Sequence, residues 1–376
     1  MHWFIESSAH IFQDLITTYH DLNPTTVDEL HEEPSPLEFM RHVARNRPFV
    51  VRKGARDWRA KKRWNASYLK DIMADQHVNV AVTPHGNADS IIPLDDGGML
   101  FVEPYETSMP FTDVLEKIQK NEKSHEESEP IFYAQTQNDN LRNEYHTLFT
   151  DVPRSIPFAH IALEKEPDAI NFWLGSSRSV TALHKDNYEN IYVQVIGQKH
   201  FVLLPPVEAP CVNERAVSAG IYQPRHRPQA QSQDATQTSE TELVQNGDTS
   251  YSLNDLEISI EDNAEYVPFA TWDPDKPLHN ATPYSPLAQP LRVTLDEGDI
   301  LYLPALWYHK VSQSCSAEGI CCAVNYWYDL DFGGGFWSMA SFVRGVGLLS
   351  LEGQKKKMKD KANDDEDKEE EDDGFQ

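Results

Sequence analysis

The chain has 376 residues, of which 33 are basic and 60 acidic, giving a formal net charge of −27 at pH 7. So acidic a chain repels phosphate backbones and anionic lipid, and we expect neither a nucleic-acid nor a membrane partner. Hydrophobic residues make up 39% of the chain, enough for a substantial core, which excludes wholesale disorder. The four cysteines fit neither a disulfide framework nor a CxxC zinc site, and no targeting segment is visible. A cytoplasmic or nuclear protein is therefore expected.

The first 130 residues are expected to form a mixed, largely helical extension that packs on the rest of the fold. Apolar residues recur there at helical spacing, at Ile11, Leu15, Ile16 and Tyr19. The run Ser35-Pro36-Leu37-Glu38 has the form of an N-cap followed by a proline in the first turn, which predicts a helix through Ala44. The other expected elements are a strand at Pro48–Val51, a helix from Asn65 to about Asp75 and a strand at Val78–Val82.

From Ile131 onward the apolar pattern changes to the period of two that is typical of strands. The expected strands are Ile131–Thr136, Ala169–Leu174, Ile191–Ile196, Lys199–Leu204, Leu291–Leu295, Ile300–Leu303, Tyr308–Gln313 and Ile320–Tyr328. Gly197-Gln198 predicts a tight hairpin between the third and fourth of them. Many short strands joined by turns favour a mainly β fold with flanking helices, a jelly-roll core over residues 131–335. An apolar helix at Phe336–Leu351 follows, within residues 336–352.

Two polar segments stand apart from this core. Residues 223–262 are rich in Gln, Ser, Thr and acids, and residues 353–376 end in an acidic block. Neither can bury enough apolar surface to offset the entropy of ordering, so both are expected to be disordered. The tail is interpreted as a solvated segment that keeps the protein soluble, and the alternative is a contact with a basic partner.

His184 and Asp186 are the first candidate functional residues. In an extended strand, residues two apart project to one face, so this imidazole and carboxylate can bind one metal ion. The evidence is weak by itself, because a chain with fifteen histidines contains such a triplet by chance. Downstream, a strand that follows Pro304 carries His309, which can complete a set of two histidines and one carboxylate, the pattern of non-haem Fe(II) sites. Taken alone, His309 would be interpreted as a packed core histidine.

The hairpin after this pair contains a lysine that matters for the same site. Lys199 shares one face of its strand with Phe201 and Leu203, but the pattern does not decide which face points inward. An inward lysine is costly unless an anion meets it, and a dicarboxylate co-substrate would supply that anion. Thr181 could donate a hydroxyl hydrogen to the same carboxylate. The alternative is that Lys199 is an exposed strand lysine.

Together these motifs resemble the JmjC (jumonji, cupin-like) 2-oxoglutarate oxygenases. The matching runs are Asn171–Gly175, Thr181–Asn190, Gly197–Phe201, Leu301–His309 and Ala323–Tyr328. The resemblance extends from about Pro34 to Leu349, outside the 223–262 segment. It implies a double-stranded β-helix that uses Fe(II) and the co-substrate 2-oxoglutarate.

Carried over position by position, the resemblance assigns eight residues. The iron ligands would be His184, Asp186 and His309. The residues that hold 2-oxoglutarate or line its pocket would be Lys199, Thr181, Tyr133, Asn190 and Asn325.

The resemblance also implies a function, a protein hydroxylase that modifies lysine in a translation-associated GTPase of the developmentally regulated GTP-binding class. Two alternatives would use the same iron site, histone-tail demethylation and cleavage of histone tails at methylated arginine. A third reading is a non-catalytic cupin scaffold that acts by binding. Related oxygenases dimerise through terminal helices, so a homodimer is expected.

Overall fold

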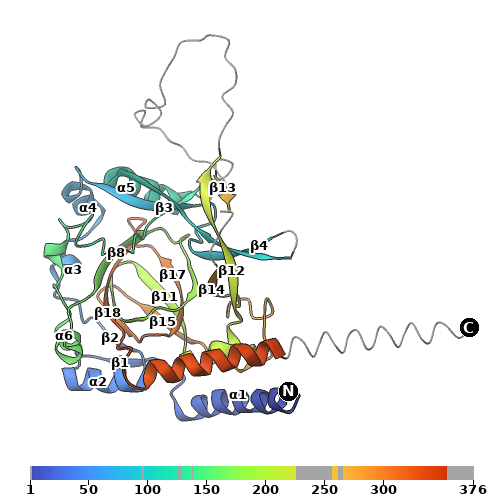
Figure 1. The fold of residues 1–376 in the computed structure, drawn as a ribbon. Helices are drawn as coiled ribbons and strands as arrows, with labels where there is room; N and C mark the ends of the chain where they lie inside the picture. Colours follow the sequence, from blue (N-terminus) through green and yellow to red (C-terminus); the bar gives the residue numbers. More distant parts are fainter. Residues whose placement is uncertain are drawn as a thin grey trace, which may run out of the picture.

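The computed structural model describes residues 2–94, 97–124, 129–137, 139–225, 256–260 and 266–353, with side chains from residue 10 onward. Its centre consists of two facing β-sheets, with helices outside them (Figure 1). The larger sheet has nine strands, in the spatial order β1 (Asp28–Leu30), β2 (Phe49–Val51), β16 (Ile300–Leu303), β10 (Tyr188–Ile196), β18 (Cys321–Asp329), β8 (Ala169–Gly175), β7 (Ile131–Ala134), β3 (His77–Thr83) and β6 (Tyr105–Pro110).

A four-stranded sheet faces it and closes the barrel. Its strands are β15 (Leu291–Leu295), β11 (Gln198–Leu204), β17 (Tyr308–Ser314) and β9 (Thr181–His184). A third sheet lies at the mouth and contains β13 (Leu256–Ser259), β12 (Glu214–Pro224), β5 (Met99–Glu103) and β4 (Ser90–Pro93), with β14 (Tyr266–Ala270) also paired with β12. The jelly-roll prediction is confirmed.

The nine-stranded sheet is buried on both faces. Tyr192 of β10 points between the two sheets, where it packs edge-on against Phe201 of β11. The alternate residues Ile191 and Val193 point the other way, into a second core beneath the helices. Because both faces are covered, the strands read as nearly continuous apolar runs.

Six helices precede the C-terminal one: α1 (His2–Leu22), α2 (Pro36–Arg45), α3 (Arg59–Arg63), α4 (Ala66–Ile72), α5 (Phe111–Lys123) and α6 (Pro157–Leu163). The predicted start of α2 is confirmed. The Glu38 amide donates to Ser35 Oγ at 3.3 Å, and the Ser35 amide donates to the Glu38 carboxylate at 2.8 Å. This capping box directs Phe39 into the core, where its ring packs against Tyr302 of the sheet.

The last helix covers residues 336–353, close to the predicted range. It lies beside α1 (Figure 1), and its Val346 packs with Phe12 and Ile16 of α1. The same helix also carries exposed large apolar side chains: Phe336, Trp337, Met339, Phe342 and Leu349. No helix in the described part of the chain is long and apolar enough to cross a membrane.

The structure departs from the sequence-based prediction in the polar insert. The segment 223–262 was expected to be disordered, but Leu256–Ser259 forms β13 and pairs with the end of β12. The expectation is wrong at both ends of the segment, because Gln223 and Pro224 of β12 pair with Glu257 and Leu256 of β13. Pairing between strands that are distant in the sequence is not visible in the local pattern. Residues 226–255, 261–265 and 354–376, which hold most of the polar insert and the acidic tail, lie outside the described residues.

The N-terminal extension also contributes to the central sheet itself. β2 pairs with β16, and β3 pairs with β7, so strands from the first 130 residues flank the jelly-roll strands on both sides. The prediction gave residues 83–130 no element, yet they hold β4, β5, β6 and α5.

Candidate metal and co-substrate site

The predicted metal ligands meet where β9 and β17 pair. His184 and His309 are direct partners across these strands, and their ring centroids lie 4.1 Å apart. Asp186 follows in the turn after β9, with Oδ2 at 3.8 Å from His184 Nε2 and 3.6 Å from His309 Nε2. The three candidate ligand atoms all lie within 4.8 Å of one another. One ion can therefore contact all three.

Both imidazoles are held in the tautomer that suits a metal ligand. Nδ1 of His184 lies 2.8 Å from the carbonyl oxygen of Ala182, and Nδ1 of His309 lies 3.0 Å from that of Trp307. A carbonyl oxygen can only accept, so each Nδ1 carries the hydrogen and each Nε2 presents its lone pair. Burial, reinforced by His184, lowers the pKa of His309 to about 4, which keeps this ring neutral at physiological pH.

Lys199 points into the barrel, which settles the question that the strand pattern left open. Only 2% of this residue is exposed, and its ammonium donates to the hydroxyl of Tyr133 at 2.9 Å. Gly175 makes room for that ring, because a Cβ there would lie 2.7 Å from Tyr133 Cδ2. Burial disfavours the ammonium, but the oxygens of Tyr133 and Tyr192 outweigh it and hold the pKa of Lys199 above its ordinary value.

No acidic side chain in the described part of the chain forms an ion pair with Lys199. A buried cation without a counter-ion is costly. The space in front of Lys199 is therefore suited to an anionic ligand.

A polar network beside the ligands fixes two predicted asparagines. Asn325 Nδ2 donates to Asn190 Oδ1 at 3.1 Å, and the indole of Trp173 donates to Asn325 Oδ1 at 2.9 Å. Thr181 lies on β9, opposite Val311 of β17. The structure brings all eight predicted site residues around one cavity: Tyr133, Thr181, His184, Asp186, Asn190, Lys199, His309 and Asn325.

The sequence did not point to the aromatic walls of this cavity. Trp173, Tyr192, Phe201 and Trp327 also line it. Tyr192, Phe201 and Trp327 each lie two residues after a predicted site residue on the same strand (Asn190, Lys199 and Asn325), so the alternation of faces indicates them once the inward face is known. They surround the polar residues with apolar surface, which limits the entry of water.

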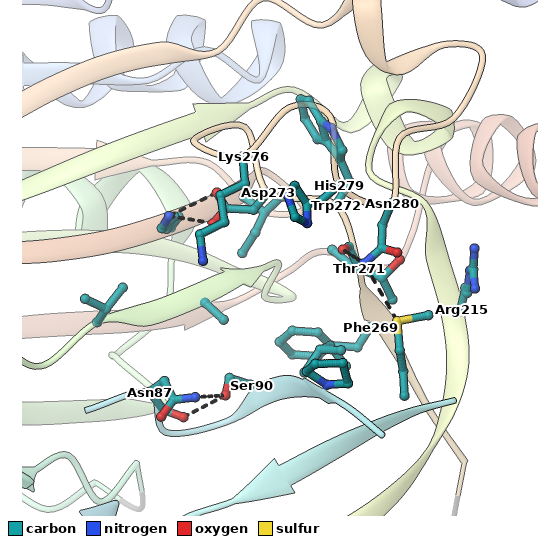
Figure 2. A pocket seen from close by; sticks show the side chains of 18 of the residues that line it. Asn87, Ser90, Arg215, Phe269, Thr271, Trp272, Asp273, Lys276, His279 and Asn280 are labelled. Carbon is teal, nitrogen blue, oxygen red and sulfur yellow. Dashed lines mark hydrogen bonds and ion pairs between the residues drawn. The ribbon is translucent and has the colours of Figure 1, made fainter. Parts of the chain in front are cut away.

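A second cavity, of about 280 Å³, opens from the first and shares Gln137, Thr181 and His184 with it. Beyond Phe269 and Ala270 it meets a larger pocket of about 700 Å³, shown in Figure 2. Asp273, one of the labelled residues there, is held by the ammonium of Lys310 at 2.8 Å. The second cavity therefore adjoins both the metal site and the larger pocket.

An ion-pair network anchors the turn that carries Asp186. Lys185, between two candidate ligands, donates to Glu214 Oε2 at 2.8 Å, and Glu214 also accepts from Tyr308 at 3.1 Å and from Arg344 of the last helix. Burial alone would raise the pKa of Glu214, but Arg344 and Lys185 outweigh it and lower the pKa to about 2. The sequence gave no sign of this carboxylate, because β12 itself was not predicted.

The comparison with known proteins agrees with this geometry. Residues 34–334 match the cupin-like domain family. The chain is 35% identical to human JMJD7, a bifunctional peptidase and (3S)-lysyl hydroxylase, over 82% of this chain and 86% of that protein. It is 32% identical to the lysine-specific demethylase JMJ32 of Arabidopsis thaliana, over 82% and 83% of the two chains. It is 30% identical to JmjC domain-containing protein E of Dictyostelium discoideum, over 88% and 92%.

The family match covers most of the chain, and three long alignments agree with it. The jelly-roll core and the His-Asp-His cluster are the fold and the metal site expected of the same family. The chain therefore belongs to the cupin-like JmjC family and is a 2-oxoglutarate-dependent oxygenase.

Proposed function

We propose that this protein is an Fe(II)- and 2-oxoglutarate-dependent hydroxylase that acts on a lysine side chain of another protein. One observation carries the proposal. A single cavity has two imidazoles and a carboxylate on one side and the buried ammonium of Lys199 on another. The first set suits a ferrous ion, and the second suits the far end of a dicarboxylate.

The donor set fits Fe(II) in particular. Two neutral imidazoles and one carboxylate leave other coordination positions open, the arrangement used by non-haem Fe(II) oxygenases. His184, Asp186 and His309 would hold the ion. When bound, Fe(II) would activate O₂, the oxidant, while 2-oxoglutarate would supply two electrons and be decarboxylated to succinate and CO₂, so that one oxygen atom enters succinate and the other an unactivated C–H bond of the substrate.

The residues of the cavity would position the co-substrate. Lys199 would pair with its distal carboxylate, with Tyr133 and Thr181 hydrogen-bonded to the same group. Asn190 and Asn325, fixed by their mutual hydrogen bond, would present amide groups to the rest of the molecule. The aromatic walls would exclude water from the reacting atoms.

Two observations support a lysine in a protein as the substrate. The cavities next to the metal site, of about 280 Å³ and 700 Å³, have room for a target side chain and its neighbouring residues. The similar human protein is named as a lysyl hydroxylase. The family resemblance favours a translation-associated GTPase of the developmentally regulated GTP-binding class as the target.

The test has two stages. Purified protein with Fe(II) and 2-oxoglutarate should form succinate, and an Asp186→Ala variant should form none above the background rate. Equal rates would favour a binding scaffold and contradict the proposal. Mass spectrometry of candidate protein substrates then distinguishes a gain of one oxygen on lysine from loss of a methyl group or from chain cleavage. The last two outcomes would replace hydroxylation by the demethylase or peptidase reading.

We also propose that the protein forms a homodimer through its last helix. Met339 and Phe342 of this helix are 70% and 69% exposed, and Phe336 and Trp337 near its start are exposed as well. Exposed apolar surface of this kind is typical of an interface. Sedimentation of the wild type as a dimer, and of a Phe342→Lys variant as a monomer, is expected. A monomeric wild type would contradict the proposal.

A further inference from the structure

The 280 Å³ cavity beside the metal ligands contains a carboxylate that the site so far does not use. Asp89 lines this cavity together with His184. This cavity adjoins the one that contains the His-Asp-His cluster, because the two share Gln137, Thr181 and His184, so a substrate side chain bound in it would lie next to the metal ligands.

Asp89 is held in an unusual backbone conformation by its neighbours. Its φ is +50°, a left-handed value that aspartate tolerates better than most residues. The turn around it is fixed by Asn87 and Ser90. The Asn87 amide donates to Ser90 Oγ at 2.9 Å, and Ser90 Oγ donates to the Asn87 carbonyl at 2.7 Å (Figure 2). The carboxylate is thereby presented to the cavity by a rigid turn.

The carboxylate lacks a strong partner. Its one hydrogen bond among the described residues is long, 3.4 Å from Gln135 Nε2, and no lysine or arginine among those residues forms an ion pair with it. Burial raises the pKa of Asp89 to about 6, although the nearby His184 acts in the opposite direction. A cationic ligand that donates a hydrogen bond to this carboxylate would provide the missing partner.

The other charges in the cavity are already compensated. Glu214 is bound by Lys185, Tyr308 and Arg344, and Lys185 is in turn neutralised by Glu214. Among the described residues that line the cavity, Asp89 is therefore the acidic group available to a ligand.

The remaining walls suit an alkyl chain. Phe101 and Phe269 stack obliquely with their ring centroids 5.0 Å apart, and Val267 lies beside them. An apolar wall with a single uncompensated carboxylate matches a side chain made of methylene groups that ends in an ammonium. The third ring of the cavity, Tyr308, is already engaged, because the Lys185 ammonium lies 5.0 Å from its centroid and its hydroxyl donates to Glu214, so the rings do not form the open aromatic cage that selects quaternary ammonium groups.

We propose that Asp89 accepts a hydrogen bond from the ammonium of the target lysine and so selects unmethylated lysine over neutral or trimethylated side chains. The inference rests on the proposed lysyl hydroxylase function and adds the residue that determines specificity. A trimethylated lysine keeps its charge but has no N–H to donate, so it forfeits the hydrogen bond to Asp89.

The test measures binding directly. The protein is loaded with 2-oxoglutarate and with Zn(II), which is redox-inert. Saturation-transfer NMR then measures the binding of the probe, Nα-acetyl-lysine amide. The norleucine and trimethyl-lysine analogues are compared with it. The wild type should bind the lysine probe at least about tenfold more tightly than either analogue, and Asp89→Asn should lose about 10- to 100-fold in lysine affinity, as expected for a hydrogen bond to a charged group.

Asparagine is nearly isosteric with aspartate and also tolerates positive φ, so the variant should fold. Its affinity for Zn(II) and 2-oxoglutarate should equal that of the wild type. Asp71→Asn, the same change at an exposed carboxylate on α4 outside the cavity, is the matched control and should keep lysine binding. Equal binding of lysine and norleucine, no detectable lysine binding, or full lysine affinity in Asp89→Asn would each overturn the inference. Succinate formation tests the oxygenase function separately, so the two failures are distinguishable.

Discussion

His184 and His309 face each other in register across β9 and β17, and each ring is oriented by the carbonyl two residues before it. Both Nε2 atoms are thus directed toward the same point as the Asp186 carboxylate by the backbone of their own strands. A metal that enters finds its ligands already arranged, so little of the binding free energy is spent on ordering them.

Loss of one ligand should therefore abolish metal binding without unfolding the protein. Mn(II), as a stand-in for Fe(II), should stabilise the wild type by about 2.7 kcal/mol at a concentration 100-fold above its Kd, and should not stabilise Asp186→Ala. Thermal unfolding with and without Mn(II) measures this. His200→Gln is the control, because His200 contacts Thr294 and Ser314 rather than the cavity. A Mn(II) shift that persists in Asp186→Ala would contradict the assignment of ligands.

Lys199→Met should separate co-substrate binding from metal binding. Removing one partner of a buried, hydrogen-bonded charge pair costs about 2–5 kcal/mol, so the affinity for 2-oxoglutarate should fall by about 30-fold or more. Titration calorimetry in the presence of Mn(II) measures this, and the affinity for Mn(II) itself should not change. Tyr133→Phe removes the hydroxyl but leaves the Lys199 ammonium in place, so it should cost less, on the order of tenfold, the low end for a hydrogen bond to a charged group. Equal effects of the two substitutions would argue against an ion pair at Lys199.

Glu214 should make the stability of the protein depend on acid pH. Its pKa is lowered from 4.5 to about 2, so the folded state holds this proton less tightly than the unfolded chain does. Its contribution is fully present above pH 4.5 and is lost as the pH falls toward 2, an effect on the order of 3 kcal/mol. Urea unfolding across this range should show a shallower pH dependence for Glu214→Gln than for the wild type. Parallel curves would contradict the prediction.

Arg344→Met should weaken metal binding although Arg344 lies on the last helix. The substitution removes the ion pair that helps to hold Glu214 in position. Glu214 in turn binds Lys185, which lies between two metal ligands in the sequence. Substitutions of outer groups that support metal ligands typically cost about 10- to 100-fold in affinity, and we expect the low end because Lys185 still pairs with Glu214. Arg292→Met, which removes a surface ion pair with Asp275, is the control. Unchanged Mn(II) affinity in Arg344→Met would exclude this coupling.

The sequence was sufficient to predict the jelly-roll core and the site residues that lie in recognisable motifs. The eight strands predicted from Ile131 onward correspond to β7, β8, β10, β11 and β15–β18, because apolar residues recur along them between turns, whereas the four-residue β9 was not predicted. The direction of Lys199 did not follow, because it depends on which face of β11 meets the opposite sheet. That choice is set by Phe201 packing against Tyr192, a contact between strands that no local pattern encodes.

The substrate side of the site was beyond sequence reasoning for a related reason. Asp89 lies in a turn between β3 and β4, and Glu214 lies on β12, where no element had been predicted. Each becomes notable only when distant segments meet around one cavity. A lone acidic residue in a chain with 60 of them carries no signal by itself.

The way the nine-stranded sheet is assembled limits how the protein can be shortened. A fragment beginning at residue 131 would contain all eight cavity residues but would lack β2 and β3, which pair with β16 and β7. Both of those strands would then present unpaired hydrogen-bonding edges to solvent, and edges of that kind attract other chains. The oxygenase barrel is therefore not a self-sufficient module, and its minimal soluble form has to retain the N-terminal third of the chain.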